Sequence, residues 1–385
     1  MLLLLVLILS AEWTCKIRGQ FCSSEDCRQL EFKPSHTFDG KRLKKHVIRT
    51  EDVIDANFCR TLCYMESSCV SYNLKKTASS DGKYKCELNN ATFEGQEDKL
   101  KPDSEYMYRG TQNACLQNSC KNNATCQTGF TDKGYRCLCT EEFKGPYCRK
   151  GYGSCKEIFN EHKTLKNGDY LLQLPSGKIR VYCHMSSQGL GDCGGGGWTL
   201  VMKIDGRKPT FHFDSELWSS DKEFNVSAGQ ILFDNHETKL PVYWNTNFSK
   251  ICIGMKRIGQ QANFIVIPKE ATSLHALIAD GNYRSTSLGR DSWKSLIGPS
   301  GSLQKRCEIE GFNAACGDDA ARNGPKARIG IIANNNRHEC LTCDSRIGFG
   351  TGGPSDDTNT CGNVASFNAD NGDRYIKTIG YILVQ

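Results

Sequence analysis

Two acidic stretches near the end of the chain contain the residue types that could hold a metal ion. Asp356-Asp357-x-Asn359 and Asp370-Asn371-Gly372-Asp373 place carboxylate and amide oxygens on backbone rich in Gly and Asn. Calcium prefers such oxygen ligands on flexible loops. Asp356, Asp357, Asp370 and Asp373 are therefore candidate calcium ligands. The alternative, which we favour, is that both stretches are solvated loops.

A second group of residues could bind anions. Lys41-Arg42-Leu43-Lys44-Lys45-His46 packs four fixed positive charges into six residues. Such a run can bind a sulfated or carboxylated polysaccharide through several charge-assisted hydrogen bonds. A solvated surface run is the favoured alternative. The candidate polyanion-binding residues are Lys41, Arg42, Lys44 and Lys45.

The residues that could act as nucleophiles or phosphate binders match no complete catalytic motif. Cys340-x2-Cys343 has redox spacing, but its flanks look like loop, and a reactive dithiol needs a helix N-terminus that lowers one thiol pKa. We expect two structural half-cystines, for which bonding to two different partners is one option. Gly194–Gly197 lacks the Lys-Ser/Thr of a phosphate loop and predicts a tight turn before a strand at Trp198. No zinc-protease or serine-hydrolase motif is present, so we expect no enzyme and assign no catalytic residue.

Composition indicates a secreted, multidomain protein. The chain has 385 residues, enough for two to four domains, and 22 cysteines spread along its length. The 49 Lys+Arg against 43 Asp+Glu give only +6, so nucleic acid is not an expected partner. The absence of long Asp or Glu runs argues against an acidic mineral nucleator.

The first residues predict a secretory signal peptide over 1–11. Met1 to Leu9 is an uninterrupted apolar run, and Ser10 and Ala11 are small enough for cleavage. No Lys or Arg precedes the run, so a truncated or atypical start is the alternative. No stretch of about 20 apolar residues predicts a membrane span. Four sequons predict surface glycosylation, at Asn90, Asn123, Asn225 and Asn247.

The elements that would position these residues fall into three modules, of which the middle one, residues 111–149, is the shortest. Its six cysteines lie between Cys115 and Cys148. A segment this short cannot bury an adequate core and usually needs disulfides, which persist in oxidising compartments. We expect a rigid spacer without chemistry of its own.

This middle segment is similar to an EGF-like domain in Tyr135-Arg136-Cys137-Leu138-Cys139 and Gly145-Pro146-Tyr147-Cys148. The spacing alone leaves the pairing of the six cysteines open. The resemblance implies Cys115–Cys126, Cys120–Cys137 and Cys139–Cys148. Thr111-Gln112-Asn113 lacks the carboxylates of calcium-binding versions, so no calcium is expected in this domain.

Residues 12–110 predict a small α+β module. Apolar and cysteine positions recur at three and four residues around Cys59-x3-Cys63, which indicates a short helix. Residues 70–74, 86–88 and 106–110 indicate strands. The segment resembles a PAN/apple domain through Cys59, Cys63, Cys69, Cys86 and the Tyr106-x-Tyr108 end. That resemblance implies Cys59–Cys86 and Cys63–Cys69, and leaves Cys15, Cys22 and Cys27 unassigned.

Residues 150–385 are long enough to bury a core, and predict a sheet-centred α+β domain. Residues 168–174 and 179–183 flank a Pro-Ser-Gly turn and predict a hairpin, and further strands are expected at 198–202, 264–267, 327–332 and 379–384. The block resembles a fibrinogen-like C-terminal domain through Ser154-Cys155-Lys156-Glu157-Ile158, Tyr182-Cys183-His184-Met185 and Gly194–Val201.

The later part of this block is nearer to intelectin-type relatives, through Cys340-x2-Cys343 and Thr360-Cys361-Gly362-Asn363. Relatives of both groups hold calcium near their ligand pockets, which implies Ca2+ as a candidate cofactor here. Cys155 and Cys183 are expected to be disulfide-bonded. The sequence leaves open the pairing of Cys193, Cys252, Cys307, Cys316, Cys340, Cys343 and Cys361.

The order of the three modules, with the segment Asp344–Gly353, resembles secreted skeletal organic matrix proteins of stony corals, which have no assigned biochemical activity. The resemblance implies a non-catalytic adhesion or scaffold component of the extracellular matrix, in biomineralisation. Its expected partners are extracellular glycans or matrix proteins. The alternative is a calcium-dependent, glycan-binding lectin of the fibrinogen-like or intelectin type. Seven cysteines before the middle segment and nine after it are odd numbers, which predicts an interdomain or intermolecular bridge and a disulfide-linked oligomer.

Overall fold

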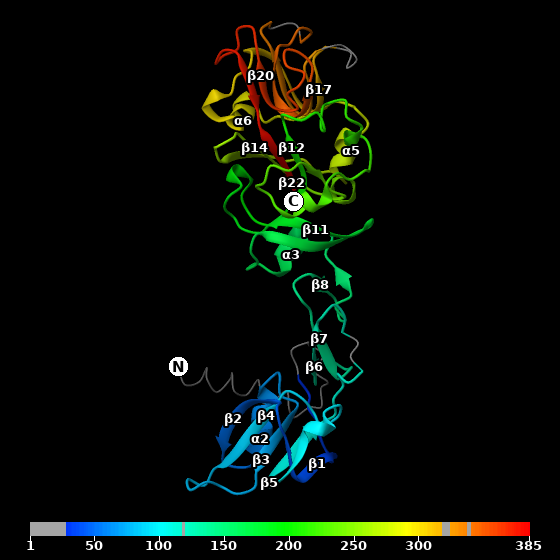
Figure 1. The fold of residues 1–385 in the computed structure, drawn as a ribbon, viewed down its shortest axis with the longest axis vertical. Helices are drawn as coiled ribbons and strands as arrows, with labels where there is room; N and C mark the ends of the chain where they lie inside the picture. Colours follow the sequence, from blue (N-terminus) through cyan, green and yellow to red (C-terminus); the bar gives the residue numbers. More distant parts are fainter. Residues whose placement is uncertain (1–27, 118–119, 318–323, 337–339) are drawn as a thin grey trace, which may run out of the picture. The chain divides into compact units, whose positions relative to one another are not determined.

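The computed structural model describes residues 28–117, 120–317, 324–336 and 340–385, and Figure 1 shows them coloured along the chain. The chain forms two compact units, a first unit that ends at Lys150 and a second unit that begins at Gly151. In the described residues the fold is mostly antiparallel β-sheet with few helices, and it is rich in disulfides. The predicted signal peptide, residues 12–27, and Cys15, Cys22 and Cys27 lie outside the described residues.

The first part of the first unit, residues 28–111, is a sheet with one α-helix packed against it. Within the described residues the sheet has five strands in the order β1-β5-β3-β4-β2. The elements are β1 (Phe32–Leu43), β2 (Val47–Val53), α2 (Ala56–Met65), β3 (Ser71–Lys75), β4 (Tyr84–Asn89), the 3-10 turn η1 (Glu97–Lys99) and β5 (Leu100–Thr111).

Helix α2 forms where the cysteine spacing predicts it. Asp55 caps its N-terminus by accepting a hydrogen bond from the Phe58 amide. Cys59 and Cys63, four residues apart, lie on one helical face and are fully buried against the sheet. The bridge Cys59–Cys86 joins α2 to β4, and Cys63–Cys69 closes the turn after the helix. These are the two pairings that the sequence resemblance implied.

The rest of the first unit, residues 112–149, is held by three disulfides rather than by a sizeable core. It contains the hairpin β6 (Thr125–Thr128) and β7 (Tyr135–Leu138), and the short strand β8 (Phe143–Lys144). β8 pairs with β9 (Lys150–Gly151), which follows directly in the sequence. Its bridges are Cys115–Cys126, Cys120–Cys137 and Cys139–Cys148, again the pairings that the resemblance implied.

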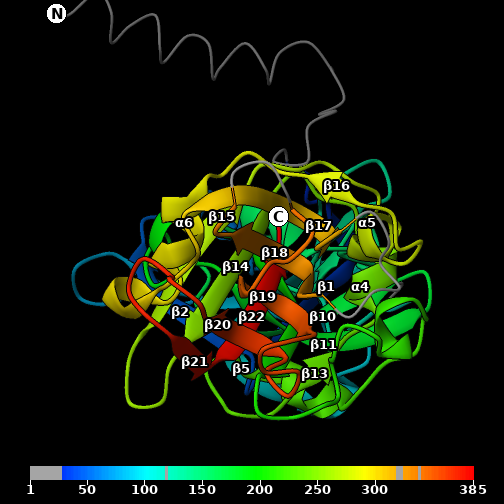
Figure 2. The ribbon, with the colours of Figure 1, turned by 90° about the horizontal axis from the view of Figure 1, so that it is seen from above.

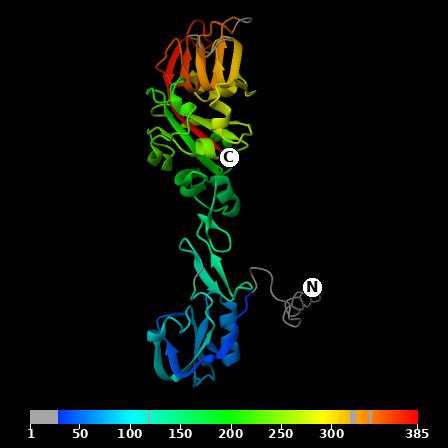
Figure 3. The same cartoon turned by 90° about the vertical axis from the view of Figure 1, so that its right-hand side faces the viewer.

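The second unit is built on two antiparallel sheets, seen from two further directions in Figures 2 and 3. Within the described residues the larger sheet has the order β10-β11-β12-β22-β14-β15, with β13 on β12, and the smaller one runs β16-β17-β18-β19-β20-β21. The strands are β10 (Gly168–Leu174), β11 (Gly177–His184), β12 (Trp198–Asp205), β13 (Thr238–Lys239), β14 (Ile251–Lys256), β15 (Ala262–Ile267), β16 (Arg284–Ser285), β17 (Arg306–Ala315), β18 (Lys326–Asn334), β19 (Ser345–Gly352), β20 (Cys361–Ala365), β21 (Arg374–Lys377) and β22 (Ile379–Val384).

Short helices and turns cover these sheets. They are α3 (Cys155–Glu161), η2 (Gly191–Cys193), η3 (Glu216–Trp218), η4 (Val226–Gln230), α4 (Val242–Asn245), α5 (Leu274–Ile278), α6 (Arg290–Ser295) and η5 (Gly298–Ser300). The core contains the fully buried side chains of Trp198, Trp218, Trp293 and Tyr243. Strand β22, the C-terminal strand, pairs with both β12 and β14, so the end of the chain lies inside the larger sheet.

The glycine run forms the predicted tight turn before β12. Gly194, Gly195 and Gly197 have φ angles of 53°, 61° and 89°, which favour glycine. A Cβ on Gly196 would lie 2.1 Å from the Met185 carbonyl oxygen, so only glycine fits there. The Trp198 indole nitrogen donates a hydrogen bond of 2.8 Å to the Gly194 carbonyl, which fixes the first residue of the strand.

Four further disulfides lie in the described part of the second unit: Cys155–Cys183, Cys193–Cys252, Cys307–Cys340 and Cys316–Cys343. Cys340 and Cys343 are half-cystines in a loop, as expected, and they bond to different partners. The odd cysteine among the described residues is Cys361, a fully buried thiol on β20. Cys361 therefore does not form the expected intermolecular or interdomain disulfide, because its buried thiol cannot reach another chain while the unit is folded.

Candidate functional site

The basic run lies at the end of β1 and in the turn before β2, and one of its four cations is already paired. The Arg42 guanidinium donates to both carboxylate oxygens of Glu87, lies 3.5 Å from Asp103 and stacks 4.1 Å from the centroid of the Tyr106 ring. Its hydrogen bonds to Glu87 raise the pKa of Arg42. Since the Glu87 side chain is only 3% exposed, Arg42 neutralises a buried carboxylate and is a structural residue.

The other three cations are exposed, and the sheet brings two more lysines to them. Lys41, Lys44 and Lys45 are exposed. The Lys44 amide donates to the Lys99 carbonyl, and Lys101 on β5 is the register partner of Arg42. We call Lys41, Lys44, Lys45, Lys99 and Lys101 the basic turn. Lys99 and Lys101 join the basic turn because β1 pairs with β5, more than fifty residues later. The local sequence around Lys41 gives no indication of this pairing.

We predict that the basic turn, rather than Arg42, determines retention on heparin. Replacing Lys41, Lys44 and Lys45 by Gln should weaken binding about tenfold, because each exposed ion pair contributes a few tenths of a kcal/mol to about 1 kcal/mol. The measurement is the elution salt on a heparin column, since screening by salt weakens exposed pairs.

A triple variant of the exposed lysines Lys222, Lys250 and Lys305 carries the same charge change and is the matched control. Equal shifts for the two triple variants would show that only net charge matters. Arg42→Gln should instead lower the stability of the first unit, because it leaves Glu87 buried without its partner.

The acidic candidate Asp370 is occupied by cations of the protein itself. Its carboxylate accepts hydrogen bonds of 2.7 Å from both Arg290 and Lys294 and one of 3.1 Å from the Leu303 amide. Burial would raise the pKa of Asp370, but the hydrogen bonds from Lys294 and Arg290 outweigh it and lower the pKa to about 2. Asp370 therefore holds α6 to the loop before β21.

This pairing predicts an acid-dependent loss of stability in the second unit. The pKa of Asp370 is about 2 in the folded state, below the unfolded value of about 3.9, so its contribution is present above about pH 4 and disappears as the pH falls toward 2. The partly exposed site reduces the effect to about 1 kcal/mol. Unfolding by denaturant between pH 5 and pH 2 measures it. Asp370→Asn should flatten the profile, whereas Asp373→Asn, exposed on the same loop, should leave it unchanged.

The other acidic candidates bond within the protein or face solvent. Asp357 accepts a hydrogen bond of 3.0 Å from His212, and Asp356 caps the Thr358 amide with its carboxylate. The fully buried Arg346 donates to the Pro354 and Asp356 carbonyls and so fixes this loop. Asp373 is exposed. Nowhere in the described residues do three or more His, Cys, Asp or Glu side chains gather as metal ligands.

The four sequons lie at exposed positions, Asn90, Asn123, Asn225 and Asn247. The Asn225 side-chain nitrogen donates a hydrogen bond of 2.9 Å to the Glu237 carbonyl. An N-linked sugar would be attached to this same nitrogen, so glycosylation of Asn225 would have to accommodate the hydrogen bond. The other three positions are in solvent-exposed turns or loops.

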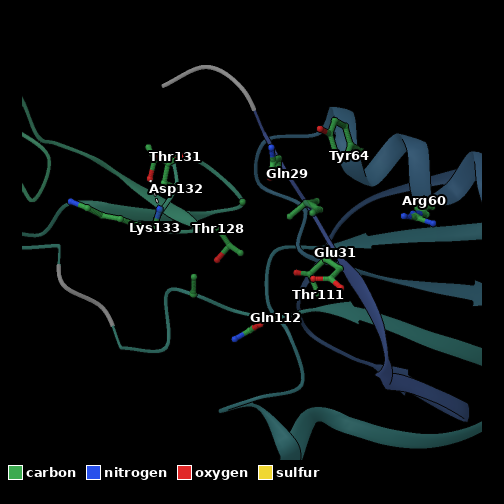
Figure 4. A pocket seen from close by; sticks show the side chains of 14 residues that line it. Gln29, Glu31, Arg60, Tyr64, Thr111, Gln112, Thr128, Thr131, Asp132 and Lys133 are labelled. Carbon is green, nitrogen blue, oxygen red and sulfur yellow. Dashed lines mark hydrogen bonds between the residues drawn. The ribbon is translucent and has the colours of Figure 1, made fainter. Parts of the chain in front are cut away.

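A pocket that the sequence analysis missed lies within the first unit, between α2 and the β6–β7 hairpin (Figure 4). Its volume is about 1010 Å³. Gln29, Glu31, Arg60 and Tyr64 line one side, and the hairpin residues 128, 129 and 131–134 line the other. The residues come from four separate stretches of sequence, so no local motif could have pointed to it.

Arg28 joins the two sides of this pocket. Its guanidinium donates to the carbonyls of Cys63, Glu66 and Cys69 at the end of α2, and to Thr128 on the hairpin. The Gln29 amide continues the connection with a hydrogen bond of 2.5 Å to the Gly129 carbonyl. Burial lowers the pKa of Arg28 to about 10, so the side chain remains charged at neutral pH. The hairpin is therefore tied to the helix by a buried cation.

No protein-family model matches the sequence, and no curated protein matches it either. In the described part of the chain, no helix has both the length and the apolar character needed to cross a membrane.

Proposed function

We propose that the protein is a secreted, non-catalytic component of an extracellular matrix that adheres through several modules. The observation that carries the proposal is the density of disulfides. Nine bridges form among the described residues, and both units contain fully buried ones, such as Cys59–Cys86 and Cys155–Cys183. Bridges at this density persist in oxidising compartments and are rare in the cytosol of most organisms.

The sequence resemblances support the same proposal and give it detail. They suggest a PAN/apple module over 12–110, an EGF-like module over 111–149 and a fibrinogen-like domain over 150–385, in the order found in stony coral skeletal matrix proteins. The basic turn, in which every lysine but the Asp98-paired Lys99 is exposed, and the pocket are two separate candidate binding surfaces in the first unit. Several weak sites on one chain add up through avidity when the partner is an immobilised matrix.

The proposal is tested by fractionating mineralised matrix from the animal that makes the protein. The powder is washed with high salt and free sugars, and the mineral is then dissolved in acid. We expect the protein in the acid fraction, as a disulfide-containing species. Recovery in the salt and sugar washes would contradict a matrix role, and elution from a glycan column by a calcium chelator would favour the lectin alternative.

A further inference from the structure

The pocket of the first unit has walls that are fixed before any ligand arrives. Arg28 ties the end of α2 to the hairpin, and the Gln29 amide hydrogen bonds to Gly129. Arg28 also forms an antiparallel bridge with Phe130. A preformed pocket loses little conformational entropy on binding, and this supports a binding role. Its volume lies at the upper end of the range for small-ligand sites, about 300–1,000 Å³, and leaves room for more than one sugar ring.

The lining of the pocket is mostly polar. Amides come from Gln29 and Gln112, and hydroxyl groups come from the buried Thr111 and Thr128 and the exposed Thr131. The three hydroxyls donate to the Val70 carbonyl, the Asn113 side chain and the Tyr135 carbonyl, so toward a ligand their oxygens act as acceptors. Ordinary small-molecule sites are lined mainly by apolar and aromatic side chains, so this pocket is unsuited to an apolar ligand. Hydroxyl oxygens that accept hydrogen bonds, beside amides that donate them, suit a ligand that carries many hydroxyls.

The charges in the pocket argue against a polyanion. Glu31 and Asp132 are exposed there, and in the described residues neither carboxylate has an ion-pair partner. Lys133 extends away from the pocket and donates to the Tyr147 hydroxyl. Arg60, whose guanidinium lies 5.6 Å from the centroid of the Phe32 ring, is the other cation among the described lining residues. The lining therefore has no excess of positive charge for an anionic polysaccharide, in contrast to the basic turn.

An aromatic ring at the edge of the pocket completes the arrangement. The Tyr64 side chain is 38% exposed, and its hydroxyl donates to the Arg28 carbonyl, so the orientation of the ring is restrained. An amphipathic ring of this kind offers an apolar surface to the C–H groups of a sugar while its polar end stays bonded.

We propose that this pocket binds a neutral oligosaccharide without a metal ion. Glu31 and Asp132 accept hydrogen bonds from sugar hydroxyls, Gln112 and Arg60 donate to ring or hydroxyl oxygens, and Tyr64 packs against the sugar ring. This inference deepens the proposed function, because it names one class of matrix ligand. It rests on the proposed function in one respect, namely that the ligand is extracellular.

The test measures binding of the full chain by calorimetry, in calcium and in EDTA. The probes are lactose, chitotriose, maltotriose and mannotriose, with a heparin hexasaccharide and a tryptic digest of gelatin alongside. We expect at least one neutral oligosaccharide to bind equally in both buffers. The double variant Glu31→Gln/Asp132→Asn should bind it at least about tenfold more weakly, since a lost hydrogen bond to a charged group has an effect of this size.

The matched control is Asp52→Asn/Glu141→Gln. It removes two exposed carboxylates, one from the sheet module and one from the three-disulfide segment, and should bind like the unmodified protein. Thermal unfolding of both variants shows that they are folded. The inference is overturned if no neutral oligosaccharide binds, if the pocket variant binds normally, if EDTA abolishes binding or if only the peptides bind. Retention in mineralised matrix without sugar binding would overturn this inference alone and leave the proposed function standing.

Discussion

Removing the Cys193–Cys252 bridge should lower the free energy of unfolding of the second unit by about 4 kcal/mol. The two cysteines are separated by 59 residues, and the bridge restricts a long loop in the unfolded chain. For a unit of this size the loss corresponds to a fall in melting temperature of about 8–16 °C. The variant Cys193→Ala/Cys252→Ala and chemical denaturation under non-reducing conditions measure the effect.

The control for loop length is the bridge Cys63–Cys69 of the first unit. Its cysteines are fully buried and separated by only six residues, so the same chain-entropy argument predicts a loss of about 2 kcal/mol. Similar losses for the two double variants would show that buried sulfur contacts, rather than restriction of the unfolded chain, account for the stabilisation.

Replacing Arg28 by Ala should release the β6–β7 hairpin from α2. The substitution removes the Arg28 hydrogen bonds to the carbonyls of Cys63, at the negative end of the helix dipole, and of Cys69. The Glu66 carbonyl keeps its hydrogen bond from the Cys69 amide. We expect a destabilisation of about 2–4 kcal/mol, as for other buried charged hydrogen-bonding groups. The measurement is amide hydrogen exchange at Gln29 and Gly129, which should become faster by about 30- to 1,000-fold, consistent with that free energy.

Two other substitutions make the Arg28 experiment specific. Arg28→Lys keeps the charge but lacks the planar fork that reaches several carbonyls, so it should restore only part of the protection. Arg60→Ala removes an exposed arginine from the same helix and should change the stability by less than about 0.5 kcal/mol. Unchanged exchange in Arg28→Ala would mean that the backbone hydrogen bonds and Phe130 hold the hairpin by themselves.

Local patterns predicted many elements of this fold because their signals lie within a few residues. The cysteine spacing around Cys59 predicted α2, and the Pro-Ser-Gly turn predicted the β10–β11 hairpin. The glycine run before Trp198 predicted a turn whose φ angles require glycine. In each case the constraint is steric or periodic and acts on neighbours in sequence.

The surfaces were much less predictable, because they depend on pairing over long distances. The sequence around Asp370 suggested a metal ligand. In the structure its carboxylate forms ion pairs with Arg290 and Lys294, nearly eighty residues earlier. Arg42 looked like part of an anion site, whereas the sheet places it against Glu87. The pocket requires Arg28 to meet a hairpin a hundred residues later. Neither composition nor spacing contains these contacts.

The buried thiol of Cys361 affects how a chain with so many disulfides keeps its cysteines correctly paired. Burial raises the pKa of this thiol to about 12, so almost none of it is the reactive thiolate at neutral pH. In a chain with nine described bridges, an accessible thiolate would attack neighbouring sulfurs and exchange their partners. While the second unit is still unfolded, Cys361 can take part in such shuffling and help wrong pairs to rearrange. Once β20 is buried, the Cys361 thiol can no longer reach the disulfides. Disulfide exchange through this thiol then stops, and the native pairing of the cysteines is kept.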